Sequence, residues 1–202
     1  MHVAAILLAA GFSSRMGAPN KLVMPIGGRP LIARVAQAVV DAVDTRPLVV
    51  LGHEAAQVRK ALGDMPVDLV TNPSPEHGQS SSVRLGLETV PEAETTLIVL
   101  GDLAFLTADA LRALLRDHDA AGDGRITVPM NGDVRGNPIA LPRAQRQSIL
   151  ASGARIGCGG FTRKHPELTR PFATQDPAFF MDVDTPDALA EARVRLGDTC
   201  VT

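Results

Sequence analysis

The chain contains no tryptophan and no tyrosine, and its 202 residues include only 6 phenylalanines. Proteins that bind single-stranded nucleic acid stack the bases on aromatic side chains, so this composition argues against that class. The formal net charge of −2 also argues against a nucleic-acid backbone as the main partner. We therefore expect no nucleic-acid partner.

The sequence is also poor in cysteine and in long hydrophobic runs. The two cysteines, Cys158 and Cys200, do not have the spacing of a zinc site. No apolar run reaches the roughly 18 to 20 residues that a membrane span requires, and no secretory signal is visible. We therefore expect a cytoplasmic protein with unpaired thiols and no membrane partner.

What the sequence does contain is an alternation of apolar and amphipathic segments. With 45% hydrophobic and 21% charged residues, we expect a single globular domain over residues 1–202. The predicted strands are Val3–Leu8, Pro47–Leu51, Val67–Thr71 and Thr95–Leu100, and the predicted helices are Pro30–Val43, Glu54–Leu62 and Thr107–Asp117. Buried strands that alternate with helices predict an α/β fold, with an open, mostly parallel sheet and helices on both faces, as in Rossmann-like proteins.

The last third of the chain is less regular. Arg125–Pro129 and Asn137–Leu141 are predicted to be extended, and a helix is expected within Ala154–Lys164. Phe179–Val183 is predicted to be a final strand and Pro186–Leu196 a terminal helix. No linker divides this part from the rest.

A glycine-bounded loop follows the first predicted strand. It reads Leu8-Ala9-Ala10-Gly11-Phe12-Ser13-Ser14-Arg15-Met16-Gly17. Gly11 and Gly17 allow positive φ and close approach of a ligand, and successive backbone N–H groups favour an anion. Arg15 and the nearby Lys21 add positive charges suited to phosphate oxygens. The spacing fits neither a P-loop nor a dinucleotide fingerprint, so the loop predicts a polyphosphate site of another kind.

Other chemistry-bearing residues follow other strands. Ligands of open α/β sheets bind outside the carboxyl ends of the strands, where the Gly11 loop, Gly52-His53 and Gly101-Asp102 would converge. Asp102 is placed to hold Mg²⁺ against a triphosphate, although it could also be a turn or helix-capping residue. Asp182 and Asp184 would point to the same side of a strand, and one of them, with Asp184 favoured, is predicted to be a second metal ligand.

A serine cluster follows Gly78. Ser80, Ser81 and Ser82 open a predicted helix, and serine is a favoured helix cap. Three serines in a row also offer donors and acceptors to a nucleobase or a ribose. Both interpretations stay open.

Taken together, these stretches resemble the MocA-like nucleotidyltransferases, the family of molybdenum cofactor cytidylyltransferases and their relatives. The matching stretches are the Leu8–Gly17 loop with Lys21, residues 49–54, Gly78–Leu87, Gly101-Asp102, Arg135-Gly136-Asn137-Pro138, residues 153–155 and Asp182–Leu189. They cover nearly the whole chain. The resemblance implies a nucleotide-diphospho-sugar transferase-like fold.

The resemblance also implies an activity. A member of this family transfers a nucleoside monophosphate from a nucleoside triphosphate, here expected to be CTP, to a phosphorylated acceptor such as molybdopterin, and pyrophosphate leaves. Mg²⁺ would be the cofactor, and a molybdoenzyme-maturation protein would be a partner. Guanosine and adenosine triphosphates remain open as substrates.

By resemblance, each motif has a role. Lys21, Arg15 and Asp102 would be the catalytic residues, and Asp102, Asp184 and Asp182 would hold the metal. The nucleotide would contact Leu8, Ala9, Ala10, Gly11, Ser13, Ser14, Arg15, Lys21, Gly52, Gly78, Ser80, Ser81, Ser82 and Gly101. Arg135, Gly136, Asn137 and Pro138 would lie toward the acceptor.

The sequence leaves two alternatives to this function. Leu150-Ala151 stands where the family commonly has Gly-Asp, which removes an acid from the acceptor side and leaves room for another acceptor, such as a sugar phosphate. A catalytically silent nucleotide-binding relative is the other alternative. The joint presence of Lys21, Asp102 and Asp184 favours an enzyme, because a sensor could discard the metal site.

Overall fold

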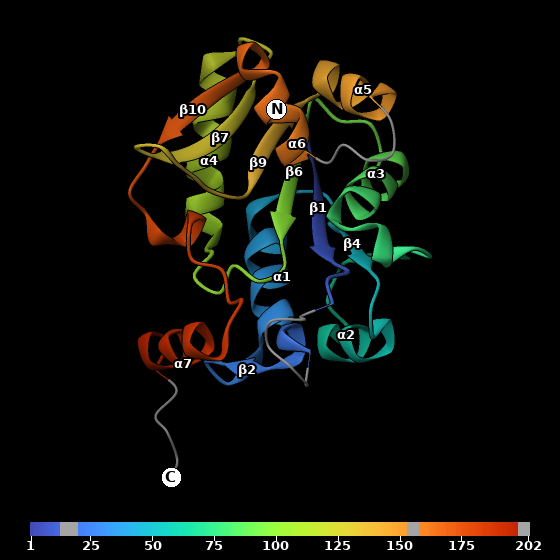
Figure 1. The fold of residues 1–202 in the computed structure, drawn as a ribbon, viewed down its shortest axis with the longest axis vertical. Coiled ribbons are helices and arrows are strands. Elements are labelled where there is room, and N and C mark those ends of the chain that lie inside the picture. The colour runs from blue at the N-terminus through green and yellow to red at the C-terminus, as the bar shows by residue number, and fades with distance from the viewer. Residues whose placement is uncertain (13–19, 153–157, 198–202) are drawn as a thin grey trace.

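The computed structural model of the chain describes residues 1–12, 20–152 and 158–197. Within these ranges the strands are β1 (Val3–Ala9), β2 (Pro25–Ile26), β3 (Arg29–Pro30), β4 (Leu48–Leu51), β5 (Asp68–Thr71), β6 (Thr95–Leu100), β7 (Ile126–Asn131), β8 (Val134–Arg135), β9 (Ile139–Pro142) and β10 (Thr169–Ala173). Eight of them form one sheet in the order β10-β7-β9-β6-β1-β4-β5, with β8 paired to β7, whereas β2 and β3 pair separately (Figure 1).

The centre of the sheet is parallel. β5, β4, β1 and β6 run in one direction, and β7 and β10 are parallel to each other. β9 pairs antiparallel with both β6 and β7. The predicted open, mostly parallel sheet is confirmed, and the reversed strands β9 and β8, the latter paired antiparallel with β7, make it mixed.

In the described ranges, seven α-helices pack around the sheet (Figure 1). They are α1 (Leu31–Ala42), α2 (Ala55–Leu62), α3 (Gln79–Thr89), α4 (Ala108–Ala121), α5 (Arg143–Ala151), α6 (Cys158–Lys164) and α7 (Pro186–Arg195). In β1, alternate residues enter two cores, since Ala5 and Leu7 pack with residues of α1, α2, α4 and α7, whereas Ile6 and Leu8 pack with residues of α3, α5 and α6. Helices therefore lie on both faces, as predicted. None of the helices in the described ranges is long and apolar enough to cross a bilayer.

The last third of the chain contains the one wrong strand prediction. Phe179–Val183 is not a strand: it begins at the end of a 3₁₀ helix, η5 (Pro177–Phe179), and continues without regular structure. Phe179 and Val183 are buried, which explains the apolar pattern, but the Val183 N–H donates to the carbonyl of Asp102 and not to a neighbouring strand. The edge strand next to β7 is instead β10, which the sequence analysis did not predict.

A buried histidine lies between α4 and the sheet. His118 on α4 is 8% exposed, and its Nδ1 lies 2.7 Å from Oγ1 of Thr127 on β7. Burial, followed by the Arg170 guanidinium, lowers the pKa of His118, although Asp123, Asp119 and Asp117 act in the opposite direction. The folded protein therefore holds His118 in its neutral form more strongly than the unfolded chain does.

This burial predicts a dependence of stability on pH. Below the ordinary histidine pKa of 6.5, the unfolded chain binds a proton at His118 that the folded protein does not yet bind. The free energy of unfolding should therefore decrease as the pH is lowered below 6.5, by up to about 1.4 kcal/mol per pH unit from this one group. In urea denaturation between pH 7.5 and 5.5, His118→Gln should flatten the profile, whereas His77→Gln, whose side chain is 72% exposed in the wild type, should leave it unchanged. Equal slopes in wild type and His118→Gln would contradict the prediction.

Candidate active site

The ends of three neighbouring strands form the base of the site. Leu8 of β1 lies in register with Leu100 of β6, and the Gly101 N–H donates to the Leu8 carbonyl at 3.0 Å. A Cβ on Gly101 would lie 2.8 Å from that carbonyl oxygen, so glycine is needed for this approach. On the other side of β1, a Cβ on Gly52 would lie 2.6 Å from the Cβ of Ala10. These glycines bring the segments after β6, β1 and β4 together, as the sequence predicted.

Lys21 lies at this edge of the sheet in a short 3₁₀ helix, η2 (Lys21–Val23). Asn20 begins the helix, and its Oδ1 accepts the Leu22 N–H at 3.0 Å. The Lys21 side chain is buried and its Nζ donates to two carboxylates, at 2.6 Å to Oδ2 of Asp102 and at 2.5 Å to Oδ1 of Asp184. A lysine from near the start of the chain thus joins acids from its middle and its end.

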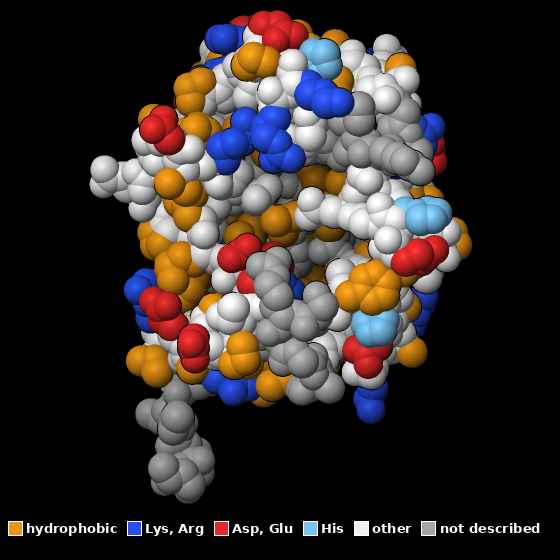
Figure 2. Space-filling model, viewed as in Figure 1, with side chains coloured by type: hydrophobic (Ala, Val, Ile, Leu, Met, Phe, Trp, Pro, Cys, Tyr) orange, Lys and Arg blue, Asp and Glu red, His pale blue; other side chains and the backbone are white. Residues whose placement is uncertain are grey.

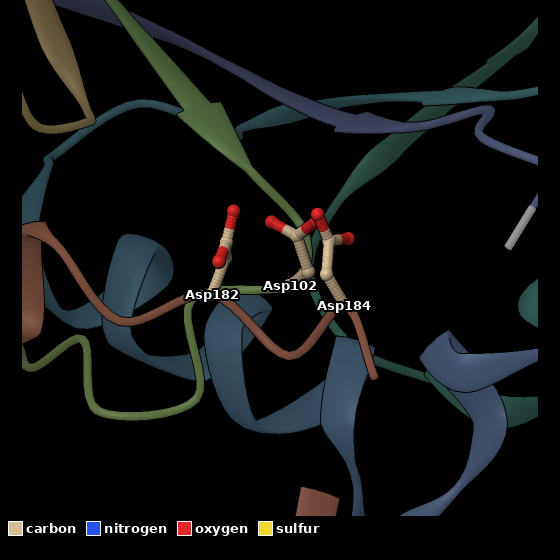
Figure 3. Close-up of side chains that lie close together, drawn as sticks. All are labelled: Asp102, Asp182 and Asp184. Atoms are coloured by element: carbon tan, nitrogen blue, oxygen red, sulfur yellow. The ribbon is translucent and has the colours of Figure 1, made fainter. Parts of the chain in front are cut away.

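Three carboxylates gather beside that lysine. One oxygen each from Asp102, Asp182 and Asp184 lies within 4.8 Å of the others, and Figure 3 shows the three side chains next to one another. Asp182 and Asp184 flank Val183, whose N–H is bonded to the carbonyl of Asp102. This bond, and not the strand periodicity that the sequence analysis assumed, holds the loop against Asp102.

Helix capping does not account for these acids. Thr107 caps α4, since its Oγ1 accepts the Ala110 N–H at 3.1 Å. Thr185 caps α7, and its Oγ1 accepts the Ala188 N–H at 3.2 Å. Thr107 therefore fills the capping role considered for Asp102, which itself lies in a turn, and Asp184 is not needed to cap α7.

The charges of the cluster change its protonation equilibria. Burial lowers the pKa of Lys21, but Asp102 and Asp184 outweigh this effect and raise the pKa above its ordinary value. Burial raises the pKa of Asp182, and the charges of Asp184 and Asp102 raise it further. One ammonium thus faces more than one carboxylate, so the cluster has room for further positive charge.

The donor set fits a hard divalent cation. Oδ1 of Asp102 is buried and has no hydrogen-bond partner within the described part of the chain. Carboxylate oxygens are the ligands that Mg²⁺ and Mn²⁺ take, usually together with phosphate oxygens of a substrate. A buried oxygen of this kind next to two further acids is what such an ion would satisfy.

A cavity of about 490 Å³ opens beside the cluster. Its lining includes Leu8, Ala10, Gly11, Phe12, Lys21, Pro75, Gly78, Gln79, Ser82, Gly101, Asp102 and Asp184. Figure 2 shows the hollow in the middle of the face, with acidic side chains at its lower edge and a group of Lys and Arg side chains above it. Residues predicted from three separate motifs therefore face one space, whereas Ala9, Gly52, Ser80 and Ser81 are not in this lining.

The glycine loop is only partly described. Gly11 does not use the positive φ that a glycine allows. A Cβ at Gly11 would meet nothing within 4 Å, so neither strain nor packing in the described residues requires glycine there. Ser13, Ser14, Arg15 and Gly17 lie outside the described residues.

The serine cluster has a partner that sequence reasoning missed. Nδ2 of the buried Asn72 donates to Oγ of Ser81 at 2.8 Å and of Ser82 at 2.9 Å. Gly78 is the residue before α3, with φ 85°, and no side chain caps this helix. Ser81 and Ser82 are therefore not simple caps, because both accept hydrogen bonds from Asn72, and Ser82 also lines the cavity. A single asparagine after β5 carries no sequence signal that could have identified it.

The predicted acceptor segment packs against the loop of the acids. A Cβ on Gly136 would lie 2.5 Å from the Phe179 carbonyl oxygen, and the Asn137 N–H donates to that oxygen at 2.8 Å. Arg135 is exposed, and its Nη2 donates to Oγ1 of Thr162 at 2.7 Å. Although the residue is exposed as a whole, partial desolvation of its guanidinium, followed by the charge of Arg163, lowers the pKa of Arg135. The segment thus presents a cationic side chain near α6.

The matched family model agrees with this geometry. The model of the MobA-like NTP transferase domain matches residues 5–168, which include β1, the glycine loop, Lys21 and Asp102. The chain belongs to this family. The matched range ends before Asp182 and Asp184, which the sequence analysis predicted as metal ligands and which the structure places beside Asp102.

Two kinds of relative match the sequence. Over 129 residues, the chain is 38% identical to the bifunctional protein GlmU of Kineococcus radiotolerans, a match that covers 62% of this chain and 26% of GlmU. The chain spans about a quarter of the length of the GlmU relatives it matches. A probable molybdenum cofactor guanylyltransferase of Natronomonas pharaonis is 28% identical over 198 residues, covering 95% of this chain and 96% of that protein.

Solved structures share the fold. Rv0371c of Mycobacterium tuberculosis superimposes with a TM-score of 0.80 at 25% identity, covering 96% of this chain and 97% of that one. A nucleotidyl transferase of Methanothermobacter, Mth528, has a TM-score of 0.80 at 21% identity over 96% of this chain and 97% of its own. Rv0371c has also been solved as a complex with manganese, with a TM-score of 0.75 at 23% identity over 96% and 99% of the two chains.

Proposed function

We propose that this chain is a nucleotidyltransferase that transfers a nucleoside monophosphate from a nucleoside triphosphate to a phosphorylated small-molecule acceptor. An oxygen of the acceptor phosphate would form a bond to the α-phosphorus, and the bond between the α-phosphorus and its bridging oxygen to the β-phosphate would break. Pyrophosphate would carry away the electron pair of that bond. A phosphate is already largely ionised at pH 7, so the step requires little general-base catalysis.

The observation that carries the proposal is the joining of Lys21, Asp102 and Asp184 at one end of the cavity. Phosphoryl-type transfer depends on positioning and on neutralising charge. Lys21 would neutralise the triphosphate, as would Arg15, which is a candidate from the sequence alone. Gly11 and Gly101 would allow the substrate to approach the backbone closely, and a silent nucleotide-binding relative would not need the acids.

Asp102, Asp184 and Asp182 would hold a divalent cation, which when bound would supply charge neutralisation to the phosphates. Mg²⁺ is the proposed physiological ion, and the manganese complex of the related Rv0371c supports a divalent metal in this fold. Asp102 offers the buried oxygen described above, and Asp184 is the acid that shares Lys21 with it.

The acceptor and the base are finer parts of the proposal. CTP and molybdopterin follow from the MocA-like resemblance, and a molybdoenzyme-maturation protein would then be a partner in the cytoplasm. GTP is the second candidate, because the relative that matches almost the full chain is named a guanylyltransferase. Matches to GlmU proteins favour a different phosphorylated acceptor, such as a sugar phosphate, as the alternative. Arg135 to Pro138 would contact whichever acceptor binds.

A panel assay tests the function. The purified chain would be incubated with Mg²⁺, each of the four nucleoside triphosphates and a set of phosphorylated acceptors that includes molybdopterin, and mass spectrometry would identify adducts. We expect one triphosphate to give pyrophosphate together with a nucleotidylated acceptor. Triphosphate binding without pyrophosphate release from any pair would favour the silent relative.

A further inference from the structure

The cavity contains one aromatic side chain among its lining residues, Phe12. The other five phenylalanines are buried or half-buried, whereas Phe12 is 46% exposed. This large apolar ring lines the cavity and belongs to neither of the two cores of the sheet.

A histidine supports this ring. The ring centroids of Phe12 and His53 lie 4.9 Å apart, with 32° between their planes. The His53 N–H donates to the Ala10 carbonyl at 3.5 Å, which joins the turn after β4 to the segment after β1. The next residue, Glu54, has a left-handed φ of 51°, which is uncommon outside glycine. Figure 2 shows hydrophobic surface beside a histidine at the right edge of the hollow.

The sheet sets the separation between this ring and the acids. Phe12 follows β1 and His53 follows β4, whereas Asp102 follows β6 on the opposite side of β1. Neighbouring strands lie about 4.8 Å apart, so the ends of β4 and β6 are about 10 Å apart. The Phe12 ring leans on His53, on the β4 side of β1. A nucleotide with its phosphates at Asp102 could therefore place its base at Phe12.

We propose that Phe12, supported by His53, is the surface on which the nucleobase of the bound nucleoside triphosphate stacks. The inference rests on the proposed nucleotide site and gives a role in it to two residues to which the motifs assigned none. Gly78, Gln79 and Ser82, which line the same cavity, are then free to contact the edge of the base or the ribose. Stacking uses the π-face that every base has, so Phe12 strengthens binding of all four nucleotides, and selectivity comes from elsewhere.

Phe12→Leu tests the stacking directly, because leucine keeps apolar surface but has no aromatic face. With Mn²⁺ present, calorimetry would measure the affinity for the preferred nucleoside triphosphate and for inorganic tripolyphosphate. We expect Phe12→Leu to weaken nucleotide binding about tenfold and to leave tripolyphosphate binding unchanged. Val194→Ala, at an exposed apolar residue on α7, is the control and should change neither.

A second measurement uses tryptophan fluorescence, which the wild-type chain lacks because it contains no tryptophan. Phe12→Trp introduces a single fluorophore and retains a stacking surface, so it should bind the nucleotide like the wild type and should change its fluorescence with the nucleotide but not with tripolyphosphate. Loss of both affinities in Phe12→Leu, or of neither, would overturn the stacking. An unaffected Phe12→Leu variant of an active enzyme overturns this inference alone, whereas a wild type that binds no nucleoside triphosphate also overturns the proposed function.

Discussion

Replacing Lys21 with alanine is expected to lower the rate of pyrophosphate release at least 100-fold. Removing one donor to developing charge in a preorganised site typically costs about 3 to 4 kcal/mol of transition-state stabilisation, and each 1.36 kcal/mol is a factor of ten in rate. Lys21 is buried and lines the cavity beside Asp102 and Asp184, so water would not replace its ammonium well. Steady-state assays with saturating nucleotide and Mg²⁺ would measure the loss.

For metal binding, Lys21→Ala is expected to have no harmful effect, in contrast to its effect on turnover. Without the ammonium between Asp102 and Asp184, Mn²⁺ alone should bind Lys21→Ala at least as tightly as the wild type, because a competing positive charge is gone. Lys60→Ala, at an exposed lysine on α2, is the matched control and should leave both activity and Mn²⁺ affinity unchanged. Near-normal turnover by a folded Lys21→Ala protein would remove this lysine from the mechanism.

Asp102→Asn is expected to reduce turnover by a similar factor but to affect the metal in the opposite way. Asparagine keeps the shape of the side chain and loses its charge, so the buried oxygen becomes a weaker ligand. We expect the affinity for Mn²⁺, measured by calorimetry or electron paramagnetic resonance without nucleotide, to fall at least tenfold.

Asp109→Asn is the matched control for this substitution. Its side chain is 93% exposed in the first turn of α4, away from the cluster, and the variant should bind Mn²⁺ like the wild type. Wild-type Mn²⁺ affinity in a folded Asp102→Asn variant would show that the acids serve only to hold Lys21. Together, the Lys21 and Asp102 variants separate neutralisation of the substrate from binding of the metal.

The parallel half of the fold could be predicted because its strands are continuous apolar runs. β1, β4 and β6 are almost wholly buried, which leaves little competition between local pattern and tertiary structure. β10 was missed because Arg170 and Pro171 interrupt its apolar character, although proline is tolerated in an edge strand. Phe179–Val183 was predicted to be a strand because it is rich in apolar residues, but only Phe179 and Val183 are buried and the segment between them is an irregular loop.

The site was predictable where a motif marks it. Lys21, Asp102 and Asp184 were each placed from local sequence, and the structure brings them into contact. The ring contact of Phe12 with His53 and the hydrogen bond from Asn72 to Ser81 are different, because the motifs assigned no role to Phe12, His53 or Asn72. No local pattern encodes such pairs, so they become visible only in the folded chain.

A crystal structure of the chain with Mn²⁺ and a non-hydrolysable analogue of its preferred triphosphate would test the central claim most directly. The account predicts the metal on Asp102 and Asp184, the phosphates against Lys21 and the base over Phe12, all in the one cavity. An analogue bound at another face, with Lys21 still joined to both acids, would contradict it.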